Sequence, residues 1–260
     1  MKVVIIGSGS KGNCIYIEDE KYNYLIDFGL SYKQVVKRLN DLNIKFNPHY
    51  LFLTHEHNDH TNGIKTLYKN FKIPIYLSKG TYTGLSKDIL DIIDIMDLNF
   101  IKSFDSIKLN NVIINPFFIS HDANEPLGYL FDFNDKKILI ATDTGYIDQK
   151  VMKYFLNNDL YILEANHDPE MLMLSNRPYD LKQRIFSDKG HLSNEECANI
   201  LINSVGYNTK KVVFAHISEE CNLNEKISDT VLKMFKLYDV NLENIEFLFS
   251  SQNEPLVIDL

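Results

Sequence analysis

The sequence predicts an α/β fold of the αββα sandwich type, in which two mixed sheets pack face to face with helices outside. Segments with strand character and segments with helical periodicity follow the order strands, helices, strands, helices, twice over. A chain of 260 residues is long enough for one large core, and it contains no fixed-period repeat and no long Pro/Gly/Ser-rich linker. We therefore expect a single domain over residues 1–260, whose two halves, roughly 1–125 and 126–260, each contribute one sheet.

Short runs rich in Val, Ile and Tyr, bounded by Gly or charged turns, predict the strands. In the first half these runs cover residues 2–6, 14–18, 22–27, 50–53, 73–77, 106–109 and 112–119. In the second half they cover residues 128–133, 137–141, 160–163, 211–215, 245–249 and 256–258.

Helical spacing of apolar residues predicts the helices. They cover residues 31–42, 62–69, 82–90, 149–156, 193–205 and 225–238. Ser193 and Glu196 fit a capping box, which predicts that Ser193 is the N-cap of its helix. Residues 168–187 mix Met, Arg and Pro, and their pattern fits either an arm or a helix.

The charge and cysteine content restrict the partners and the compartment. A net charge of -8 argues against a broad basic surface for nucleic acid, so any such role must rest on a local site and bound cations. Three cysteines, far apart and odd in number, fit a reducing compartment. The apolar run at the N-terminus is shorter than the roughly 7–15 residues of a secretory signal. No stretch reaches the ~18 apolar residues of a membrane span, so we expect a cytoplasmic protein without a membrane partner.

The strongest chemical signal follows the predicted strand 50–53 and comprises His55, His57, Asp59 and His60. Imidazole nitrogen and carboxylate oxygen suit zinc, iron or manganese. A loop can aim His55 and His57 at one point, while Asp59 and His60 at a helix start aim at a second point. Two ions in such a site lie roughly 3.5–4 Å apart. The alternative is a polar loop that happens to be rich in histidine.

His-x-His-x-Asp-His is the signature of the metallo-β-lactamase-fold hydrolases, which this sequence resembles. The resemblance implies further ligands at strand ends, where His121, Asp143 and His216 are found. It places His55, His57 and His121 on one ion and Asp59, His60 and His216 on the other, with Asp143 bridging both. Taken singly, His121 and Asp143 also fit turns, and His216 fits a helix-capping neighbour. Diiron oxidoreductases of this fold replace the second His by Glu, so His57 favours hydrolysis over redox chemistry.

Three further segments, residues 7–14, 163–168 and 190–194, resemble the WalJ/YycJ proteins, also called VicX. That resemblance implies manganese- or zinc-dependent nucleases with 5′-to-3′ exonuclease action on DNA and a link to mismatch repair. Nuclease relatives with an inserted β-CASP domain are much longer, and this chain has no room for that insertion.

Glu164 and His191 resemble a pair in the tRNA 3′-processing nuclease RNase Z, where a Glu supports a His. An imidazole held by a carboxylate can protonate a leaving oxygen, so we count both as catalytic candidates with Asp59. The alternatives are that His191 caps the helix at Ser193 and that Glu164 forms a surface salt bridge. His167 fits either a residue behind a metal ligand or an exposed side chain.

Several other residues allow two interpretations. Residues 7–12 form either a plain turn or a hairpin whose backbone N–H groups touch phosphate. The cations before His191 line either an edge for a nucleic-acid backbone or a solvated face; they are Arg177, Lys182, Arg184 and Lys189. Cys14 and Cys197 fit small buried residues.

Together these patterns predict an enzyme, a metal-dependent phosphodiester hydrolase, and within that class a 5′-to-3′ DNA exonuclease. Two divalent cations, Zn or Mn, would hold the attacking hydroxide, and Asp59 would orient it. The partner is nucleic acid, with DNA favoured, or a small phosphodiester; the sequence indicates no oligomeric state. The alternatives are a small-molecule hydrolase, such as a cyclic phosphodiesterase, thioesterase or lactonase, and a non-catalytic accessory of a two-component signalling system.

Overall fold

The structure, a computed structural model, describes residues 1–241 and 243–260. Contacts divide the chain into two compact units, each built on one seven-stranded mixed sheet. The first unit comprises Met1–Lys102, Ala123–Leu127 and Ser250–Leu260, and the second comprises Ser103–Asp122 and Gly128–Phe249. Two mixed sheets are thus confirmed. The predicted division near residue 125 is wrong, because strands near residues 107–118 join the second sheet and the C-terminal strand returns to the first.

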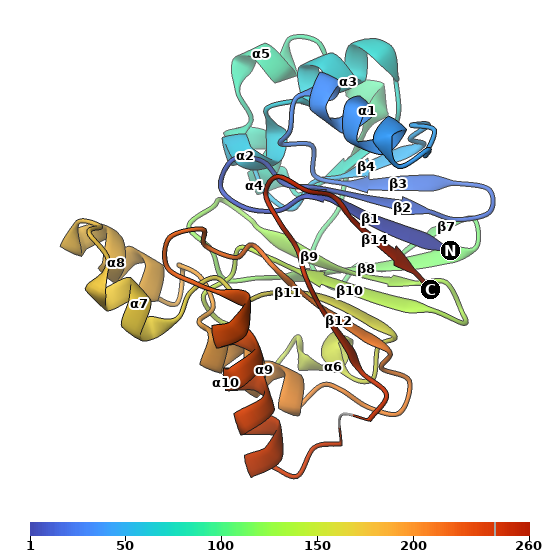
Figure 1. The fold of residues 1–260 in the computed structure, drawn as a ribbon. Helices are drawn as coiled ribbons and strands as arrows, with labels where there is room; N and C mark the ends of the chain where they lie inside the picture. Colours follow the sequence, from blue (N-terminus) through green and yellow to red (C-terminus); the bar gives the residue numbers. More distant parts are fainter. Residues whose placement is uncertain (242) are drawn as a thin grey trace. The chain divides into compact units, whose positions relative to one another are not determined.

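The sheet of the first unit has the order β14-β1-β2-β3-β4-β5-β6 (Figure 1). Its strands are β1 (Lys2–Gly7), β2 (Cys14–Glu18), β3 (Asn23–Ile26), β4 (Tyr50–Phe52), β5 (Ile75–Leu77), β6 (Leu98–Phe100) and β14 (Leu256–Asp259). Pairing is antiparallel from β14 to β3 and parallel from β3 to β6. Parallel neighbours require crossover connections. These carry the helices α1 (Tyr32–Asp41), α2 (Asn58–Thr61), α3 (Ile64–Asn70), α4 (Lys79–Gly84), α5 (Lys87–Leu90) and η1 (Ile95–Asp97).

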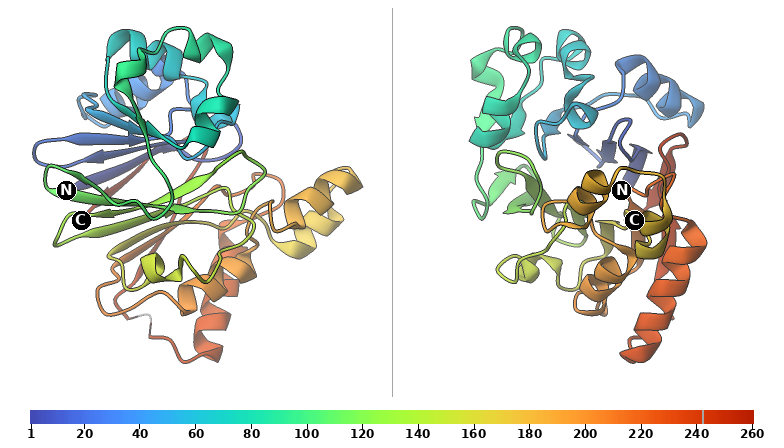
Figure 2. Two further views of the ribbon diagram at one scale, coloured as in Figure 1. Left: turned by 180° about the vertical axis from the view of Figure 1, so that it is seen from behind. Right: turned by 90° about the vertical axis from the view of Figure 1, so that its left-hand side faces the viewer.

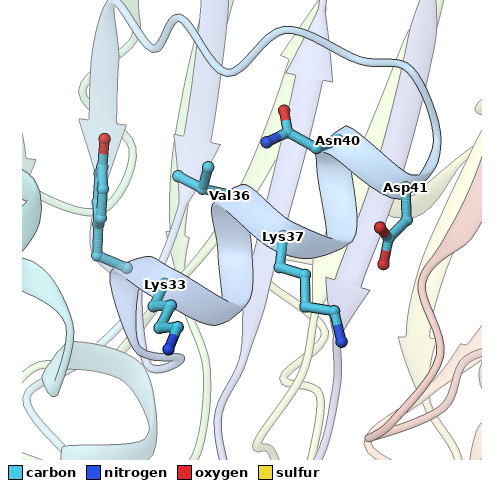
Figure 3. A pocket seen from close by; sticks show the side chains of 6 residues that line it. Lys33, Val36, Lys37, Asn40 and Asp41 are labelled. Atoms are coloured by element: carbon cyan, nitrogen blue, oxygen red, sulfur yellow. The ribbon is translucent and has the colours of Figure 1, made fainter.

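Helix α1 shows how the sequence pattern determines this unit. Ser31 and Gln34 form a capping box at its start, and Val35 and Leu39 are buried in the core of the unit. Lys33, Lys37, Asn40 and Asp41 are exposed, and with Tyr32 and Val36, which pack against the same core, they line a hollow on the surface of the helix (Figure 3). The predicted helix over 31–42 is therefore confirmed, with one apolar face inward.

Three local features of the first unit differ from the prediction. The expected helix over 82–90 is two short helices, because Leu85 between them adopts an extended backbone. A separate turn of helix, α2, precedes α3 and carries two of the candidate ligands. Strand β6 and the 3₁₀ turn before it were not predicted, since three residues with a central Asn give too short a pattern.

The sheet of the second unit has the order β13-β12-β11-β10-β9-β8-β7. Its strands are β7 (Ile107–Leu109), β8 (Val112–Phe118), β9 (Leu127–Asp132), β10 (Lys137–Ala141), β11 (Leu160–Glu164), β12 (Lys211–Ala215) and β13 (Glu246–Phe249). From β10 to β13 the pairing is parallel, and β11 is buried along its whole length. The helices of this unit are α6 (Met152–Phe155), α7 (Pro169–Leu174), α8 (Tyr179–Phe186), α9 (Asn194–Ile202) and α10 (Asn224–Leu237).

Residues 168–187, called the arm below, form a hairpin of the two short helices α7 and α8. Figure 1 and the left-hand view of Figure 2 show the arm projecting beyond the strand ends of the second sheet. The side chain of Asp168 caps α7. Leu172 and Ile185 of the arm form a small apolar cluster with Cys221. The choice between arm and helix is thereby decided: the segment is both.

His167, directly before the arm, is buried at 1% exposure, so the interpretation as an exposed residue is wrong. Its ring lies edge-on against Phe186 of α8, with centroids 5.1 Å apart. Neither ring nitrogen has a hydrogen-bond partner among the described residues. Burial lowers the pKa of His167 to about 4, and this outweighs the opposing charge of Glu164.

The capping box at Ser193 is present as predicted: its hydroxyl accepts from the Glu196 amide at 3.2 Å, and the Glu196 carboxylate accepts from the Ser193 amide at 2.8 Å. Because truncation removes a partner of an otherwise unbonded helix amide, we expect Ser193→Ala to lower the free energy of unfolding by about 1 kcal/mol. Ser31→Ala should behave similarly at α1. Ser228→Ala, inside α10, is the control and should be neutral or slightly stabilising. Urea unfolding measures all three, and an unchanged midpoint in Ser193→Ala would contradict the assignment.

We expect His167 to make the protein acid-labile. Since the folded state binds a proton at His167 more weakly than the unfolded chain does, stability is highest above the unfolded pKa near 6.5 and falls towards pH 4. His167→Leu should reduce the slope of unfolding free energy against pH in this window by up to about 1.4 kcal/mol per pH unit. Urea unfolding of chelator-treated protein at pH 6.5, 5.5 and 4.5 tests this. Burial also lowers the pKa of His121, so some slope should persist in the variant; an identical slope would contradict the prediction.

Candidate metal centre

Within the first unit, the structure brings the four predicted ligands between β4 and α3 together. His57 is the N-cap of α2, Asp59 lies in its first turn and His60 in its last. The ring of His55 lies 4.6 Å from that of His57 and 4.0 Å from that of His60, measured between centroids. His60 Nε2 lies 3.6 Å from the carboxylate of Asp59. Three imidazoles and one carboxylate thus converge in a region where His55 and His60 are fully buried.

A buried carboxylate that we did not predict, Asp27, holds this group. It follows β3 with a φ of 57°, and its two oxygens accept from the amide and the hydroxyl of Thr54, each at 2.8 Å. His60 Nδ1 lies 2.8 Å from the same carboxylate. Because the Thr54 hydroxyl donates to Asp27, it can accept from His55 Nδ1 at 3.0 Å. Asp27 therefore orients one imidazole directly and a second through Thr54.

The glycine-rich turn between β1 and β2 is bonded to the same region through Asn13. The Asn13 amide N–H donates to the Asp59 carbonyl at 2.7 Å, and its side-chain Nδ2 lies 3.0 Å from His60 Nε2 and 3.3 Å from Asp59 Oδ2. Gly29 must be glycine, since a Cβ there would lie 1.6 Å from the Asp59 carbonyl. The turn thus fixes the backbone of α2 against β3.

The hydrogen bonds favour the plain-turn interpretation of residues 7–12. The amide of Gly9 donates to the side chain of Asn13, that of Lys11 to the side chain of Gln252, and that of Gly12 to the Gly9 carbonyl. Gly9 and Gly12 have φ values of 140° and 143°, which side chains rarely adopt. These three amides are already used within the unit, so they are poorly placed to bind phosphate.

In the second unit, three parallel strands bring the remaining candidates to one sheet edge. Asp143 follows β10, Glu164 ends β11 and His216 follows β12, and these strands are adjacent. The carboxyl ends of parallel strands meet at the same edge, which is where α/β sheets place their sites. Asp143 and His216 have positive φ values of 56° and 51°, which turn both side chains at the strand ends. The ligand-type atoms of Asp143, Glu164, His191 and His216 lie within 4.8 Å of one another.

Glu164 is the centre of this group and is fully buried, so the alternative of a surface salt bridge is wrong. Its Oε1 lies 2.7 Å from His191 Nδ1 and 2.8 Å from His216 Nδ1, and its Oε2 accepts from the Thr144 amide at 2.8 Å. Burial alone would raise the pKa of Glu164, but the charge and hydrogen bonds of His191 and His216 outweigh it, so the pKa is lowered. His191 is 20% exposed and its Nδ1 faces Glu164, so it does not cap α9; Ser193 does.

His121 follows β8, and its Nδ1 lies 3.3 Å from the carbonyl oxygen of Gly190. Its ring centroid is 5.4 Å from that of His191. Burial lowers the pKa of His121, which favours the neutral imidazole that metal binding requires. Asp122 lies beside it, 3.3 Å from Nε2, and is held by Arg184 of the arm.

The donor set fits divalent cations in a way that is visible in the hydrogen bonds. Four imidazoles direct Nδ1 at an oxygen: His55 at Thr54 Oγ1, His60 at Asp27, His121 at the Gly190 carbonyl and His216 at Glu164. In His55 and His216 this partner fixes the proton on Nδ1 and directs the Nε2 lone pair away from it, the arrangement typical of metal-binding histidines. In His60 and His121 the second ring nitrogen also has a polar neighbour: His60 Nε2 lies 3.0 Å from Asn13 Nδ2, and His121 Nε2 lies 3.3 Å from the Asp122 carboxylate. Asp59 and Asp143 add carboxylate oxygens within their own units.

Of the four cations before His191, which fit either a backbone-binding edge or a solvated face, three bond to protein groups. Arg177 donates to Glu220 at 2.8 Å, and Arg184 donates to Asp122 at 2.6 Å. The ammonium of Lys182 donates to the carbonyls of Met173 and Ser175 at the end of α7, each at 2.7 Å. Lys189 is exposed. The cysteines are free and buried, as expected for Cys14 and Cys197.

Comparison with known proteins agrees with this geometry. Residues 22–217 match the Beta-lactamase superfamily domain. The exodeoxyribonuclease WalJ of Streptococcus pneumoniae is 34% identical over 255 residues, covering 92% of this chain and 94% of that protein. The exodeoxyribonuclease YycJ of Bacillus anthracis is 32% identical over 229 residues, covering 85% and 84%.

Solved structures show the same fold at low sequence identity. Zinc-bound PqqB from Methylobacterium extorquens matches with a TM-score of 0.74 at 14% identity over 100% of both chains. The metallo-β-lactamase-fold protein YhfI from Bacillus subtilis matches with a TM-score of 0.71 at 13% identity over 98% of both chains. The fold, the ligand-type residues at the strand ends and the sequence relatives lead to one conclusion: this chain belongs to the β-lactamase superfamily, in the family of WalJ and YycJ.

Proposed function

We propose that this protein is a metal-dependent phosphodiesterase that degrades DNA as a 5′-to-3′ exonuclease. The observation that carries the proposal is the buried Glu164, which holds a partly exposed imidazole, His191, beside the ligand-type residues Asp143 and His216. A thioester releases a thiolate, which needs no such proton donor, whereas a phosphodiester releases an alkoxide that does. Relatives at 34% and 32% identity are named exodeoxyribonucleases, which supports DNA as the substrate.

Seven residues are proposed to bind two divalent cations, zinc or manganese. They are His55, His57, Asp59, His60, His121, Asp143 and His216. Support comes from each unit separately: Nδ1 of His60 and Nδ1 of His216 each face a buried carboxylate, and Asp59 and Asp143 add carboxylate oxygens beside them. When bound, such cations supply a water of lowered pKa and neutralise charge on the phosphate. The allocation of ligands to each ion stays a prediction.

Three side chains have further proposed roles in the reaction. Asp59, with its carboxylate 24% exposed, accepts a hydrogen bond from the attacking water and so directs its lone pair. His191 donates Nδ1–H to Glu164 and in its protonated form carries a second proton on Nε2, which it passes to the leaving oxygen. Glu164 is fully buried and touches two imidazoles, so we assign it a positioning role and not direct contact with substrate.

The first test is hydrolysis of a linear DNA duplex labelled at the 5′ or the 3′ end, by chelator-treated protein resupplied with Mn²⁺ or Zn²⁺. We expect metal-dependent release of the 5′ label first. Asp59→Ala should lower the rate on the order of 100-fold or more, because it removes both a ligand and the residue that orients water. Asp41→Ala, an exposed carboxylate on α1, is the matched control and should retain the wild-type rate.

Other outcomes of this assay are equally informative. Hydrolysis of bis(p-nitrophenyl) phosphate with intact DNA would replace the nuclease by a small-molecule phosphodiesterase. Metal binding without hydrolysis of either substrate would favour the non-catalytic accessory. Full activity and full metal content in Asp59→Ala would contradict the proposed site.

Asp27→Asn should weaken metal binding without removing a ligand. The amide cannot accept from both Thr54 and His60 as a carboxylate does, so His60 loses its fixed tautomer. We expect roughly a 10–100-fold loss in metal affinity, measured by competition with a chromogenic chelator. Asp41→Asn is the control. An unchanged affinity in a folded Asp27→Asn variant would show that Asp27 is only structural.

A further inference from the structure

We propose that α8 of the arm binds the DNA strand by stacking bases on Tyr179 and Phe186. The inference rests on the proposed nuclease function and identifies the surface that holds the substrate beyond the cleaved bond. It concerns residues of the second unit alone, and its contacts are independent of the metal ligands.

The two rings form an aromatic stripe on one face of α8. Tyr179 is 66% exposed and Phe186 41% exposed, although large aromatic side chains normally lie in the core. They are seven residues apart, so they lie on the same helix face about 10 Å apart along the axis. Gln183 lies on this face between them, and its Nε2 donates to the Tyr179 hydroxyl at 3.1 Å. This hydrogen bond restrains the tyrosine ring, and Phe186 is restrained by its contact with His167.

The stripe is directly connected to the proposed proton donor. The arm occupies the chain between Glu164 and His191, which are themselves hydrogen-bonded. The His191 amide donates to the Ile185 carbonyl at 3.0 Å, next to Phe186. Gly190 is required for this approach, since a Cβ there would lie 2.2 Å from the same carbonyl. The position of the stripe relative to His191 is therefore determined by backbone contacts.

A second contact fixes the arm to the loop that carries His121. Arg184, on α8, donates to Asp122 through Nε at 2.6 Å and forms a second contact through its other guanidinium nitrogen. Asp122 in turn lies 3.3 Å from His121. A strand bound on α8 would thus lie next to His191, the proposed proton donor, and His121, a proposed metal ligand.

The charge of the protein favours stacking over phosphate contacts on this surface. The net charge is -8, and Arg177, Lys182 and Arg184 already bind protein groups. Every base presents a π face, so aromatic rings can hold a strand of any sequence without a basic groove. A second copy of this chain is the competing occupant, because Met173 and Leu174 of α7 are also exposed. The two rings are separated by the polar Gln183 instead of forming one apolar patch, and this arrangement favours nucleic acid over a second copy.

The test compares Leu and Trp variants, because leucine keeps the apolar surface and removes the ring. For Tyr179→Leu and Phe186→Leu we expect the Kd of a fluorescein-labelled single-stranded oligonucleotide to rise at least about fivefold each, and roughly 30-fold together. Tyr179→Trp should restore wild-type affinity. The slope of log Kd against log salt should stay unchanged, since no phosphate contact is lost. Tyr207→Leu, a residue 93% exposed outside the arm, is the control.

Anisotropy on chelator-treated protein separates this proposal from the proposed function, because binding is measured without hydrolysis. The KM for DNA with metal-loaded enzyme should rise in parallel with the Kd, while kcat changes little. Equal Kd in the double Leu variant and wild type, or a changed salt slope, would overturn the stacking proposal even if the enzyme is a nuclease. The protein could instead form a concentration-dependent dimer. If a variant with Ala at both Tyr179 and Phe186 abolishes that dimer but leaves the Kd for the oligonucleotide unchanged, the stripe belongs to an interface with a second copy. Ring-dependent binding without hydrolysis would support the stripe and overturn the nuclease.

Discussion

The hydrogen bonds of Glu164 are the interaction on which the candidate site of the second unit depends. A carboxylate with no exposure to solvent is costly unless its oxygens are fully bonded, and here His191, His216 and the Thr144 amide bond them. Two imidazoles from different segments converge on one oxygen, so neither can rotate without leaving buried charge unbonded. The same group that stabilises the strand end therefore selects the tautomer of a proposed ligand and of the proposed proton donor.

In the first unit, different residues bond a buried carboxylate and use it to orient an imidazole. Asp27 lies just after β3, as Glu164 lies at the end of β11, and each carboxylate holds an imidazole at Nδ1. In both units the backbone around the site adopts positive φ at residues other than glycine: Asp27, Asp143 and His216. Such conformations are unfavourable for side chains, and they persist where surrounding contacts determine them. Here those contacts are the buried hydrogen bonds, so local strain and fixed orientation of the donors have one cause.

The sequence was a good guide wherever one segment carried the whole signal. The run from His55 to His60 predicted its own setting after β4 and the closeness of its side chains, because residues near in sequence follow one stretch of backbone. Asp27 was missed because a lone carboxylate at the end of a strand has no distinctive spacing, and its role appears only when Thr54 and His60 are beside it. For the cations before His191 the sequence left two interpretations open, for a related reason. Their partners, among them Asp122 and Glu220, are remote in sequence, so only the fold reveals that these charges are already bonded.

An acidic protein that acts on a polyanion must confine its attraction for phosphate to a small area. Cations bound by histidine and carboxylate would do this, because they supply charge at the bond to be cleaved and nowhere else. The rest of the strand then has to be held by forces that do not require net positive charge, and stacking on Tyr179 and Phe186 meets that condition. Such a division limits nonspecific binding along the length of DNA, which depends mainly on phosphate contacts. It would suit an enzyme that acts at strand ends, where unstacked bases are available to the rings and the terminal phosphodiester is available to His191.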